Sequence, residues 1–489
     1  MDLLNELSMS FILTLICPCV GILYLILLSK PSQLLVKKIA LFFSILTFYI
    51  SLFLWIFFEK SSLFFQWLFY KNWLSFLGIN FILGLDGISL FFILLTTFLV
   101  PMCILAGWKN IMFNVKGFVL LFLFLEIFLL LIFSVLDLVL FYIFFESVLI
   151  PMFLIIGIWG SRERKIKASY FFFIYTLLGS LVMLLGILLI LFETGTTNFL
   201  TLTSYQFSYD RQLLLWLMFF ISFAVKLPVI PFHIWLPEAH VEAPTVGSVI
   251  LAGVLLKLGV YGLVRFSFVL FPYANMYFIP FVYTISLISI LYSSLTTLRQ
   301  IDLKRIIAYS SVAHMNFGLL GLFSNTIQGL IGGLFLSISH GFVASALFLC
   351  IGVLYDRHHT RLLKYYSGLS VIMPVFSLIF LFFSLSNLGL PGTSSFVGEL
   401  LILLGSFQQN WLVSFLGTSG IFFGSLYSIW LYNRLCFGNL KIQYNSVYID
   451  LSRREFCLFI PFIFMILLLG IIPSFFLDYF YSSSFLICN

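Results

Sequence analysis

The sequence predicts an all-α polytopic membrane protein with about 14 transmembrane helices, two inverted five-helix repeats and two broken helices. Composition is the first observation: of 489 residues, 62% are hydrophobic and only 9% are charged, whereas roughly a quarter of a soluble domain is charged. Long apolar runs are the second, because about 20 helical residues cross a hydrocarbon core about 30 Å thick. The third is a pair of proline-bearing runs that lie five spans apart.

The apolar runs can be assigned one by one along the chain. The fourth and fifth are separated only by Asp137 and the closely packed runs around it. We place the spans at residues 9–29, 36–58, 83–107, 116–134, 137–158, 168–192, 212–236, 244–268, 276–298, 302–323, 328–354, 370–404, 411–434 and 455–478.

These spans divide the chain into four blocks. Residues 1–115 hold helices 1 to 3, and residues 116–268 form the first repeat with helices 4 to 8. Residues 269–435 form the second, inverted repeat with helices 9 to 13, and residues 436–489 hold a loop and helix 14. Each repeat has an odd number of spans, so the two have opposite orientations in the membrane.

Basic residues in the loops support this count and orient the chain. Loops that lead from an odd span to the next even span hold nineteen lysines and arginines, and the other loops hold only Lys60, Lys71 and Arg211. Positive charge concentrates on the cytoplasmic or matrix side of membrane proteins. We therefore expect the basic loops on that side and both termini on the opposite side.

Spans seven and twelve contain prolines that predict broken helices. Span seven carries Pro228 and Pro231, and span twelve carries Pro391 between two glycines. Proline removes a backbone hydrogen bond, and in lipid the freed carbonyl needs an internal partner or a wet cavity. Proline is common in membrane helices, so one break means little, but two at corresponding places point to an ion or substrate site.

Four charged residues lie inside predicted spans: Glu146, Lys226, Lys257 and Glu399. Each costs about 2.5–3.5 kcal/mol at the bilayer centre, so it must be paired or face water. We expect Glu146 and Lys226 to form a pair whose separation releases a proton from Lys226 toward Lys257. The alternative is a static ion pair that only holds helices together.

Two histidines extend this polar series through spans ten and eleven. His314 and His340 lie between Lys257 and Glu399 in span order. Histidine titrates near neutral pH and suits proton relay, although a single buried histidine is more often a hydrogen-bonded structural residue. The series predicts proton translocation by Glu146, Lys226, Lys257, His314, His340 and Glu399.

Other polar residues receive weaker assignments. Glu126 in span four has an accessory proton role or contacts a partner helix, and His233 is a second accessory candidate. The segment containing His233, Glu238, His240 and Glu242 has spacing that suggests zinc, but it is a proline-bounded connection without a closed four-ligand site. We expect no metal.

The sequence also gives no sign of a bound redox group. None of the seven cysteines forms paired Cys-x-x-Cys motifs, so iron–sulfur ligation is unsupported. A Gly-x-Gly-x-x-Gly nucleotide motif after a strand is likewise missing from the sequence. The net charge of +7 is scattered over loops, which predicts no nucleic-acid partner.

Several motifs resemble one family of membrane proteins. They are Phe145-Glu146-Ser147-Val148-Leu149-Ile150-Pro151-Met152, Ala224-Val225-Lys226-Leu227-Pro228, Trp235-Leu236-Pro237-Glu238-Ala239-His240, Gly253-Val254-Leu255-Leu256-Lys257-Leu258-Gly259, Asp302-Leu303-Lys304-Arg305 and Leu390-Pro391-Gly392-Thr393-Ser394-Ser395-Phe396-Val397-Gly398-Glu399. With them, nearly the whole chain resembles the antiporter-like subunits of respiratory complex I, of mitochondrial type.

The resemblance implies a proton-translocating subunit of NADH:ubiquinone oxidoreductase without a redox centre of its own. Glu146 and Lys226 would be the coupling pair, Lys257 the central relay, His314 and His340 the bridge, and Glu399 the end of the path. FMN, iron–sulfur clusters and ubiquinone are expected in partner subunits, and quinone reduction there would drive the protons.

The same resemblance implies partners and a location. The partners would be other membrane-arm subunits, including neighbouring antiporter-like subunits, and phospholipids, with basic loops that favour cardiolipin. The location would be the mitochondrial inner membrane, with the bacterial inner membrane as the alternative, since the acidic N-terminus lacks an Arg-rich presequence. Two rival functions remain: a subunit of a multi-chain sodium–proton antiporter, and a passive membrane scaffold.

Overall fold

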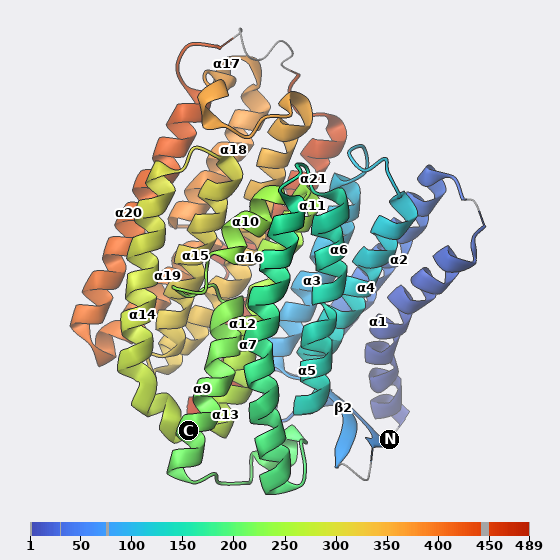
Figure 1. Ribbon diagram of the computed structural model, residues 1–489, viewed down its shortest axis with the longest axis vertical. Helices are drawn as coiled ribbons and strands as arrows, with labels where there is room; N and C mark the ends of the chain where they lie inside the picture. Colours follow the sequence, from blue (N-terminus) through green and yellow to red (C-terminus); the bar gives the residue numbers. More distant parts are fainter. Residues whose placement is uncertain (1, 30, 75–77, 442–448, 489) are drawn as a thin grey trace.

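The computed structural model describes residues 2–29, 31–74, 78–441 and 449–488, and most of them lie in long helices that run roughly parallel (Figure 1). The first part of the chain contains α1 (Asp2–Leu27), α2 (Gln33–Ile56), β1 (Gln66–Leu74), β2 (Ile79–Leu85), α3 (Gly87–Ala106), α4 (Val115–Ser134), α5 (Leu138–Ser147), α6 (Leu149–Trp159), α7 (Lys165–Thr194), α8 (Phe199–Leu202), α9 (Tyr209–Lys226) and α10 (Trp235–Glu242).

The middle of the chain contains a composite helix and the remaining long helices. The composite helix consists of α11 (Thr245–Ile250), η2 (Leu251–Leu255), α12 (Lys257–Gly262), η3 (Leu263–Ser267) and α13 (Phe268–Leu270). It is followed by α14 (Pro272–Arg299), α15 (Leu303–Leu322), α16 (Ile327–His358), η4 (Leu363–Tyr365), α17 (Leu369–Ile372), α18 (Pro374–Leu388), α19 (Ser394–Gln409), α20 (Trp411–Cys436), α21 (Arg453–Ile471) and α22 (Ser474–Cys488).

The long helices have the length and composition of membrane spans. Within the described ranges, 11 helices, counting α5 with α6 and α11 to α13 as single spans, are long and apolar enough to cross a membrane. Three predicted spans do not meet this measure. They correspond to α9 with α10, α15, and α18 with α19, which are interrupted or carry buried charges.

The structure separates spans four and five at Asp137, as predicted. The Asp137 carboxylate accepts hydrogen bonds from the backbone N–H groups of Val139 and Leu140 at the start of α5. Span five is itself two helices, because α5 ends at Ser147 and α6 begins at Leu149. Pro151 lacks the N–H that would bond to the Ser147 carbonyl, which explains the interruption.

A β-hairpin before α3 was not predicted. Strands β1 and β2 pair antiparallel, with Tyr70 opposite Ile82 and Asn72 opposite Asn80. The predicted third span begins at residue 83, whereas the structure continues β2 to Leu85 and begins α3 at Gly87. Residues 79–85 are apolar enough to be taken for the first turns of a helix, so hydropathy alone placed this boundary wrongly.

Both predicted breaks are present, and the first has partners from three helices. At the break between α9 and α10, the Trp235 indole at the start of α10 donates to the Val225 carbonyl at the end of α9 at 2.9 Å. The Ile230 N–H donates to the Ser289 hydroxyl on α14 at 3.1 Å, and the Asn316 amide on α15 donates to the Pro228 carbonyl at 3.4 Å. Backbone groups freed by the break are therefore satisfied inside the protein, as lipid requires.

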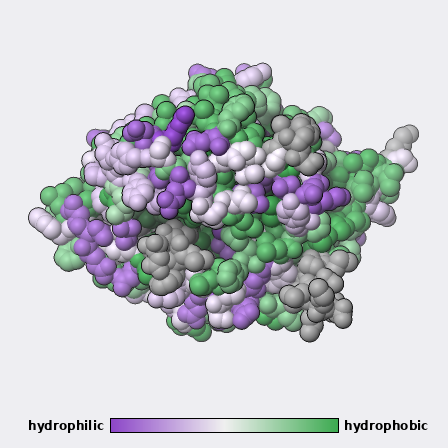
Figure 2. Space-filling view, turned by 90° about the horizontal axis from the view of Figure 1, so that it is seen from below, coloured by the Kyte–Doolittle hydropathy of each residue, from purple (hydrophilic) through white to green (hydrophobic). Residues whose placement is uncertain are grey.

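The predicted basic side lies at one end of the molecule. Asn110 donates to Asp356 at 2.5 Å, and Lys37 donates to the Trp108 carbonyl at 2.6 Å, so these loops contact one another. Helix α1 begins and α22 ends at the opposite end, which agrees with the predicted orientation (Figure 1). Viewed from that end, hydrophilic residues form patches with hydrophobic surface between and around them (Figure 2).

Glycines allow α16 and α19 to approach closely. A Cβ atom on Gly405 would lie 2.5 Å from the Gly329 backbone nitrogen, and one on Gly398 would lie 2.9 Å from the Leu336 Cβ. Gly332 would meet the backbone nitrogen of Ile402 at 2.9 Å. This contact fixes α19 against α16 and so fixes the position of Glu399, which follows Gly398.

We expect Gly405→Val to lower the free energy of unfolding by about 1–3 kcal/mol or more, because the side chain meets backbone that cannot move aside. The thermal unfolding midpoint of the purified complex measures the effect. Gly157→Ala is the control for the loss of a helical glycine, since the nearest atom to its Cβ position is the Ser169 hydroxyl oxygen at 3.6 Å. A Gly405→Val complex that unfolds at the wild-type temperature would contradict the close approach.

Candidate functional site

Four of the predicted residues form a continuous polar series that we call the central file: Lys257, His340, His314 and Glu399. The Lys257 Nζ lies 3.0 Å from His340 Nδ1. The rings of His340 and His314 have centroids 5.8 Å apart, and His314 Nδ1 lies 3.6 Å from Glu399 Oε1. Both histidines thus lie between Lys257 and Glu399 as predicted, but in the reverse of their span order: His340 on α16 is next to Lys257 on α12, and His314 on α15 is next to Glu399 on α19.

The central file is buried in the protein. Lys257 is 0% exposed, His340 is 4% exposed and Glu399 is 6% exposed. These three are not surface residues, and the His314 side chain is only 12% exposed. Burial in such a place is costly unless the charge is shared with neighbours or water, which favours a functional role for the series.

The helix around Lys257 has an unusual geometry. Lys257 begins α12, which lies between the π-helical segments η2 and η3. The Lys257 ammonium also donates to the carbonyl of Ala252 in η2. A π-helical turn is common at functional sites because it frees backbone groups from the regular pattern, and here such a carbonyl holds the lysine.

Hydrogen-bond chemistry fixes what His340 can do. An ammonium group only donates, so His340 Nδ1 must accept from a charged Lys257. The other ring nitrogen, Nε2, is buried and has no hydrogen-bond partner among the described residues. A neutral imidazole in this tautomer carries its proton on Nε2 and can receive another at Nδ1, which suits transfer from Lys257.

The end of the file at Glu399 contains a small cavity. Its volume is about 20 Å³, and His314, Asn387, Glu399 and Tyr427 are among its lining residues. A cavity of roughly 10–15 Å³ or more can hold one water molecule when polar groups face it. The Tyr427 hydroxyl also lies 3.4 Å from His314 Nε2.

Gly389 makes room for the Glu399 carboxylate. Its φ is +83°, a conformation that favours glycine, and a Cβ atom there would lie 2.5 Å from Glu399 Oε2. The break between α18 and α19 therefore brings backbone next to the carboxylate. Tyr427 and Asn387 were not predicted, because a single tyrosine or asparagine in a span carries no signal by itself.

Glu146 and Lys226 lie near each other without direct contact. The two charges are close enough to interact electrostatically, but no salt bridge joins this described pair. Instead the Lys226 Nζ lies 4.5 Å from the centroid of the Phe145 ring and has no hydrogen-bond partner among the described residues. The predicted direct ion pair is thus a separated pair, with an aromatic ring beside the cation.

Lys226 is linked to the central file only by the packing of α9 against α12. Among the described residues no hydrogen bond connects it to Lys257. The adjoining backbones are close, since a Cβ atom on Gly259 would lie 2.9 Å from the Phe223 carbonyl oxygen. The structure therefore brings together Lys257, His340, His314 and Glu399, and it leaves Glu146 and Lys226 as a neighbouring group.

A second polar group lies between the central file and the basic end. His240 is 0% exposed, stacks on Phe348 at 4.7 Å, and neither of its ring nitrogens has a hydrogen-bond partner in the described part of the chain. Lys304, which is 1% exposed, donates to the Ala243 carbonyl at 2.7 Å. A cavity of about 280 Å³ at the basic end is lined by Lys304, Asp356 and other residues.

Arg361 anchors the loop that follows α16 in the same region. It is 0% exposed, lies 3.5 Å from Glu242 Oε1 and donates to the Val241 carbonyl. Burial lowers the pKa of Arg361 from its ordinary value, and the Glu242 carboxylate opposes that shift. The sequence marked Arg361 only as a loop residue, because its partners are distant in the chain.

The accessory candidates lie outside the central file. Glu126 is 0% exposed and accepts a hydrogen bond of 2.5 Å from the Thr47 hydroxyl, which joins α4 to α2. The His233 ring lies beside Tyr292 and Tyr309, with centroids 5.6 and 6.2 Å away. Of the residues considered for zinc, Glu238 pairs with Arg305 at 2.6 Å and Glu242 lies 3.5 Å from Arg361.

Comparison with known proteins adds to this geometry. A family model described as NADH:quinone oxidoreductase/Mrp antiporter, TM matches residues 135–424. NADH-ubiquinone oxidoreductase chain 4 of Marchantia polymorpha is 56% identical over 469 residues, covering 96% of this chain and 95% of that protein. The chain belongs to the NADH-ubiquinone oxidoreductase chain 4 family.

A second relative and a solved structure are also similar to this chain over nearly its full length. NADH-ubiquinone oxidoreductase chain 4 of Chondrus crispus is 57% identical and covers 97% of this chain and 96% of that protein. A chain of respiratory complex I from Thermus thermophilus has a TM-score of 0.89 at 28% identity, and the match covers 98% of this chain and 100% of that chain.

A second kind of complex shares the fold alone. A chain of the Mrp complex from Dietzia sp. DQ12-45-1b has a TM-score of 0.82 at 19% identity. The match covers 98% of this chain and 52% of that chain.

Proposed function

We propose that this chain is a proton-translocating membrane subunit of NADH:ubiquinone oxidoreductase and that protons move along the central file. The observation that carries the proposal is the buried sequence of contacts from Lys257 through His340 and His314 to Glu399. Every member can hold or pass a proton, and both histidines lie between Lys257 and Glu399, with His340 next to the lysine and His314 next to the carboxylate. Membership of the NADH-ubiquinone oxidoreductase chain 4 family connects this path to the reduction of ubiquinone by NADH.

The chemistry of transfer follows from the contacts. Lys257 passes a proton to His340 Nδ1 across 3.0 Å, and His340 releases one from Nε2. His314 accepts it and delivers a proton to the Glu399 carboxylate, 3.6 Å away. That last distance is longer than a hydrogen bond, and a water molecule in the cavity beside Tyr427 would shorten the step.

Protons would enter from the basic end. Lys304 lines the large cavity at that end. The buried imidazole of His240 interacts electrostatically with both Lys304 and Lys257. These residues supply groups for a route between the basic end and Lys257. Glu146 and Lys226 would set the timing, because a change in their separation alters the field at the start of α12.

The architecture that supports this path has fourteen spans in two inverted repeats, helices 4 to 8 and helices 9 to 13. The breaks between α9 and α10 and between α18 and α19 occupy corresponding places in the two repeats. Spans seven, ten and twelve fall short of a simple apolar span because they carry the breaks and the buried charges. Their polar character is what a proton path inside the membrane requires.

The driving reaction takes place in partner subunits. FMN, iron–sulfur clusters and ubiquinone would be bound there, and quinone reduction would supply the energy. The partners are other membrane-arm subunits, including neighbouring antiporter-like subunits, in the mitochondrial inner membrane. Loops rich in lysine and arginine at the basic end favour anionic phospholipid such as cardiolipin.

Replacing Glu399 tests the path at its far end. We expect Glu399→Gln in the assembled complex, reconstituted into liposomes, to lower proton pumping during NADH:quinone reduction by about 10²-fold, the low end of the usual contribution of a positioned proton-transfer group. NADH oxidation by an artificial electron acceptor should be unchanged. Glu193→Gln is the matched control, since Glu193 is a partly exposed carboxylate paired with Arg211 at 3.8 Å.

The same experiment separates the rival functions. Normal pumping in the Glu399→Gln complex would favour a passive scaffold. Purification of the native particle tests the sodium–proton antiporter, because a complex I subunit must co-purify with flavin and iron–sulfur chains. A small particle that lacks them and exchanges Na⁺ for protons would overturn the assignment.

A further inference from the structure

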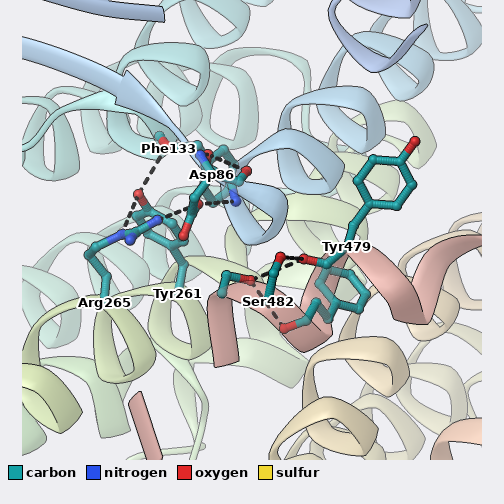
Figure 3. Close-up of polar contacts among 9 residues, drawn as sticks. Asp86, Phe133, Tyr261, Arg265, Tyr479 and Ser482 are labelled. Atoms are coloured by element: carbon teal, nitrogen blue, oxygen red, sulfur yellow. Dashed lines mark hydrogen bonds and ion pairs between the residues drawn. The ribbon is translucent and has the colours of Figure 1, made fainter. Parts of the chain in front are cut away.

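A buried ion pair lies on the same composite helix as Lys257 but outside the central file. Arg265 Nη2 lies 2.5 Å from Asp86 Oδ1, and the Arg265 and Asp86 side chains are 6% and 11% exposed. The Arg265 Nε also donates to the Tyr261 hydroxyl at 3.2 Å, and that hydroxyl donates to the Phe133 carbonyl at 2.9 Å (Figure 3). The pair joins the composite helix to the start of α3.

Tyr261 and Arg265 extend from Lys257 toward the end of the molecule where the termini lie. Lys257, Tyr261 and Arg265 are four residues apart in the sequence, so their side chains lie near one face of the helix at successive turns. A proton on Lys257 could in principle leave along this face. That exit would bypass His340, His314 and Glu399.

Arginine is chemically unable to continue such a path. Its guanidinium has donors and no acceptor and stays protonated in proteins. The Tyr261 hydroxyl is fixed as well, since it donates its proton to the Phe133 backbone carbonyl and accepts a hydrogen bond from the Arg265 Nε. Neither side chain can take up a proton from Lys257 and pass it on.

Aromatic rings fill the space around Tyr261. Phe133 packs edge-on against it at 5.1 Å, Phe92 stacks on Phe133 at 5.2 Å, and Phe141 lies 6.5 Å from Tyr261. All three phenylalanines are 0% exposed. Water therefore has little room beside Tyr261, and a water chain could not replace the side chains.

The ion pair is held firmly from the α3 side. Asp86 caps α3, accepting from the Ser89 N–H at 2.9 Å, while the Ser89 hydroxyl accepts from the Asp86 N–H at 2.8 Å. Helix α22 closes over the same place, because a Cβ atom on Gly87 would lie 2.1 Å from the Tyr479 carbonyl oxygen. The carboxylate that holds Arg265 is thus fixed at the start of α3, next to a glycine that packs against α22.

We propose that Arg265, fixed by Asp86 and Tyr261, is a positioning residue that closes the direct route from Lys257 to the terminus-bearing end and so directs protons sideways into His340. This inference rests on the proposed function, since it assumes that Lys257 carries protons. Arg265 acts through its lack of an acceptor and through the dry packing around it.

Passive proton leak tests the proposal without turnover. Purified complex is reconstituted into liposomes, a pH gradient is imposed with no NADH or quinone, and its decay is recorded with a pH-sensitive dye. We expect Arg265→Gln to raise the leak severalfold, because glutamine offers an acceptor and leaves room for water. Arg265→Lys should also raise the leak, less strongly, because an ammonium can give up its proton.

Arg361→Gln is the matched control, since it removes another buried, ion-paired arginine that lies outside the composite helix. We expect no more leak from it than from the wild type. If Arg361→Gln leaks as much as Arg265→Gln at equal thermal stability, general loss of packing explains the leak and the proposal is overturned. A folded Arg265→Gln complex with wild-type leak would overturn it too.

A double variant distinguishes this proposal from the proposed function. Lys257→Met added to Arg265→Gln should return the leak to the wild-type rate, because the leak must start at Lys257. A leak that persists in the double variant overturns the closing role of Arg265. Failure of the proposed function instead shows as normal pumping in Lys257→Met alone, whatever the leak.

Discussion

Proton pumping in a Lys257→Met complex is expected to fall by about 10²-fold or more, the range in which positioned proton-transfer groups contribute. Lys257 is 0% exposed and is the member of the central file that contacts His340. Methionine keeps most of the volume and removes the titrating group. Pumping is measured in liposomes during NADH:quinone reduction, with artificial-acceptor reduction as the measure of intact redox subunits.

Lys257→Arg separates proton transfer from the need for a buried cation. Arginine keeps the charge but does not release its proton, so this variant should fail as completely as methionine. Lys109→Met, at an exposed lysine in a basic loop, should pump normally. Substantial pumping by Lys257→Arg would show that only the positive charge matters, and would contradict transfer through this residue.

An Arg361→Ala complex is expected to lose about 3–5 kcal/mol of stability, because it leaves the Glu242 carboxylate buried without its partner. Glu242 is 2% exposed and Arg361 is 0% exposed. The arginine also holds the Val241 carbonyl, so its removal frees the loop after α16 from the end of α10. Thermal unfolding of the purified complex and the yield of assembled particle measure the loss.

The pair of Arg305 and Glu238 provides the comparison. It is shorter, at 2.6 Å, but its side chains are 32% and 34% exposed, and an exposed pair contributes about 1 kcal/mol or less. Arg305→Ala should therefore cost much less than Arg361→Ala. Adding Glu242→Gln to Arg361→Ala should restore part of the stability, and equal costs at the two arginines would show that burial does not decide the effect.

Burial in lipid explains why the central file could be found in the sequence. A charge in an apolar run is so costly that its presence alone identifies Lys257 and Glu399. The same argument marks the proline breaks, because lipid gives a freed carbonyl no partner. Span order then placed His314 and His340 between the two ends, and the structure brings these residues together as predicted.

Other features depend on packing between distant segments and leave no such mark. Tyr427 and Asn387 become part of the site only because α20 and α18 pack beside α15 and α19. The separation of Glu146 from Lys226 depends on where Phe145 points. The β-hairpin before α3 was missed because its apolar residues suit a helix as well as a strand, and pairing is decided by the partner strand.

The two breaks differ in what holds them, and this has a mechanical consequence. The first is tied by side-chain hydrogen bonds from α10, α14 and α15 to its backbone. The backbone of the second accepts from its own segment, as in the bond of Ser395 to the Ser386 carbonyl, and it packs against Gly470 of α21, where a Cβ atom would lie 2.3 Å from the Gly392 carbonyl oxygen. Gly389 and Gly392 give the second break its backbone freedom. We expect the break between α9 and α10 to act as a fixed support and the break between α18 and α19 to act as a hinge. Motion during turnover should then be greatest where the Glu399 carboxylate contacts Gly389.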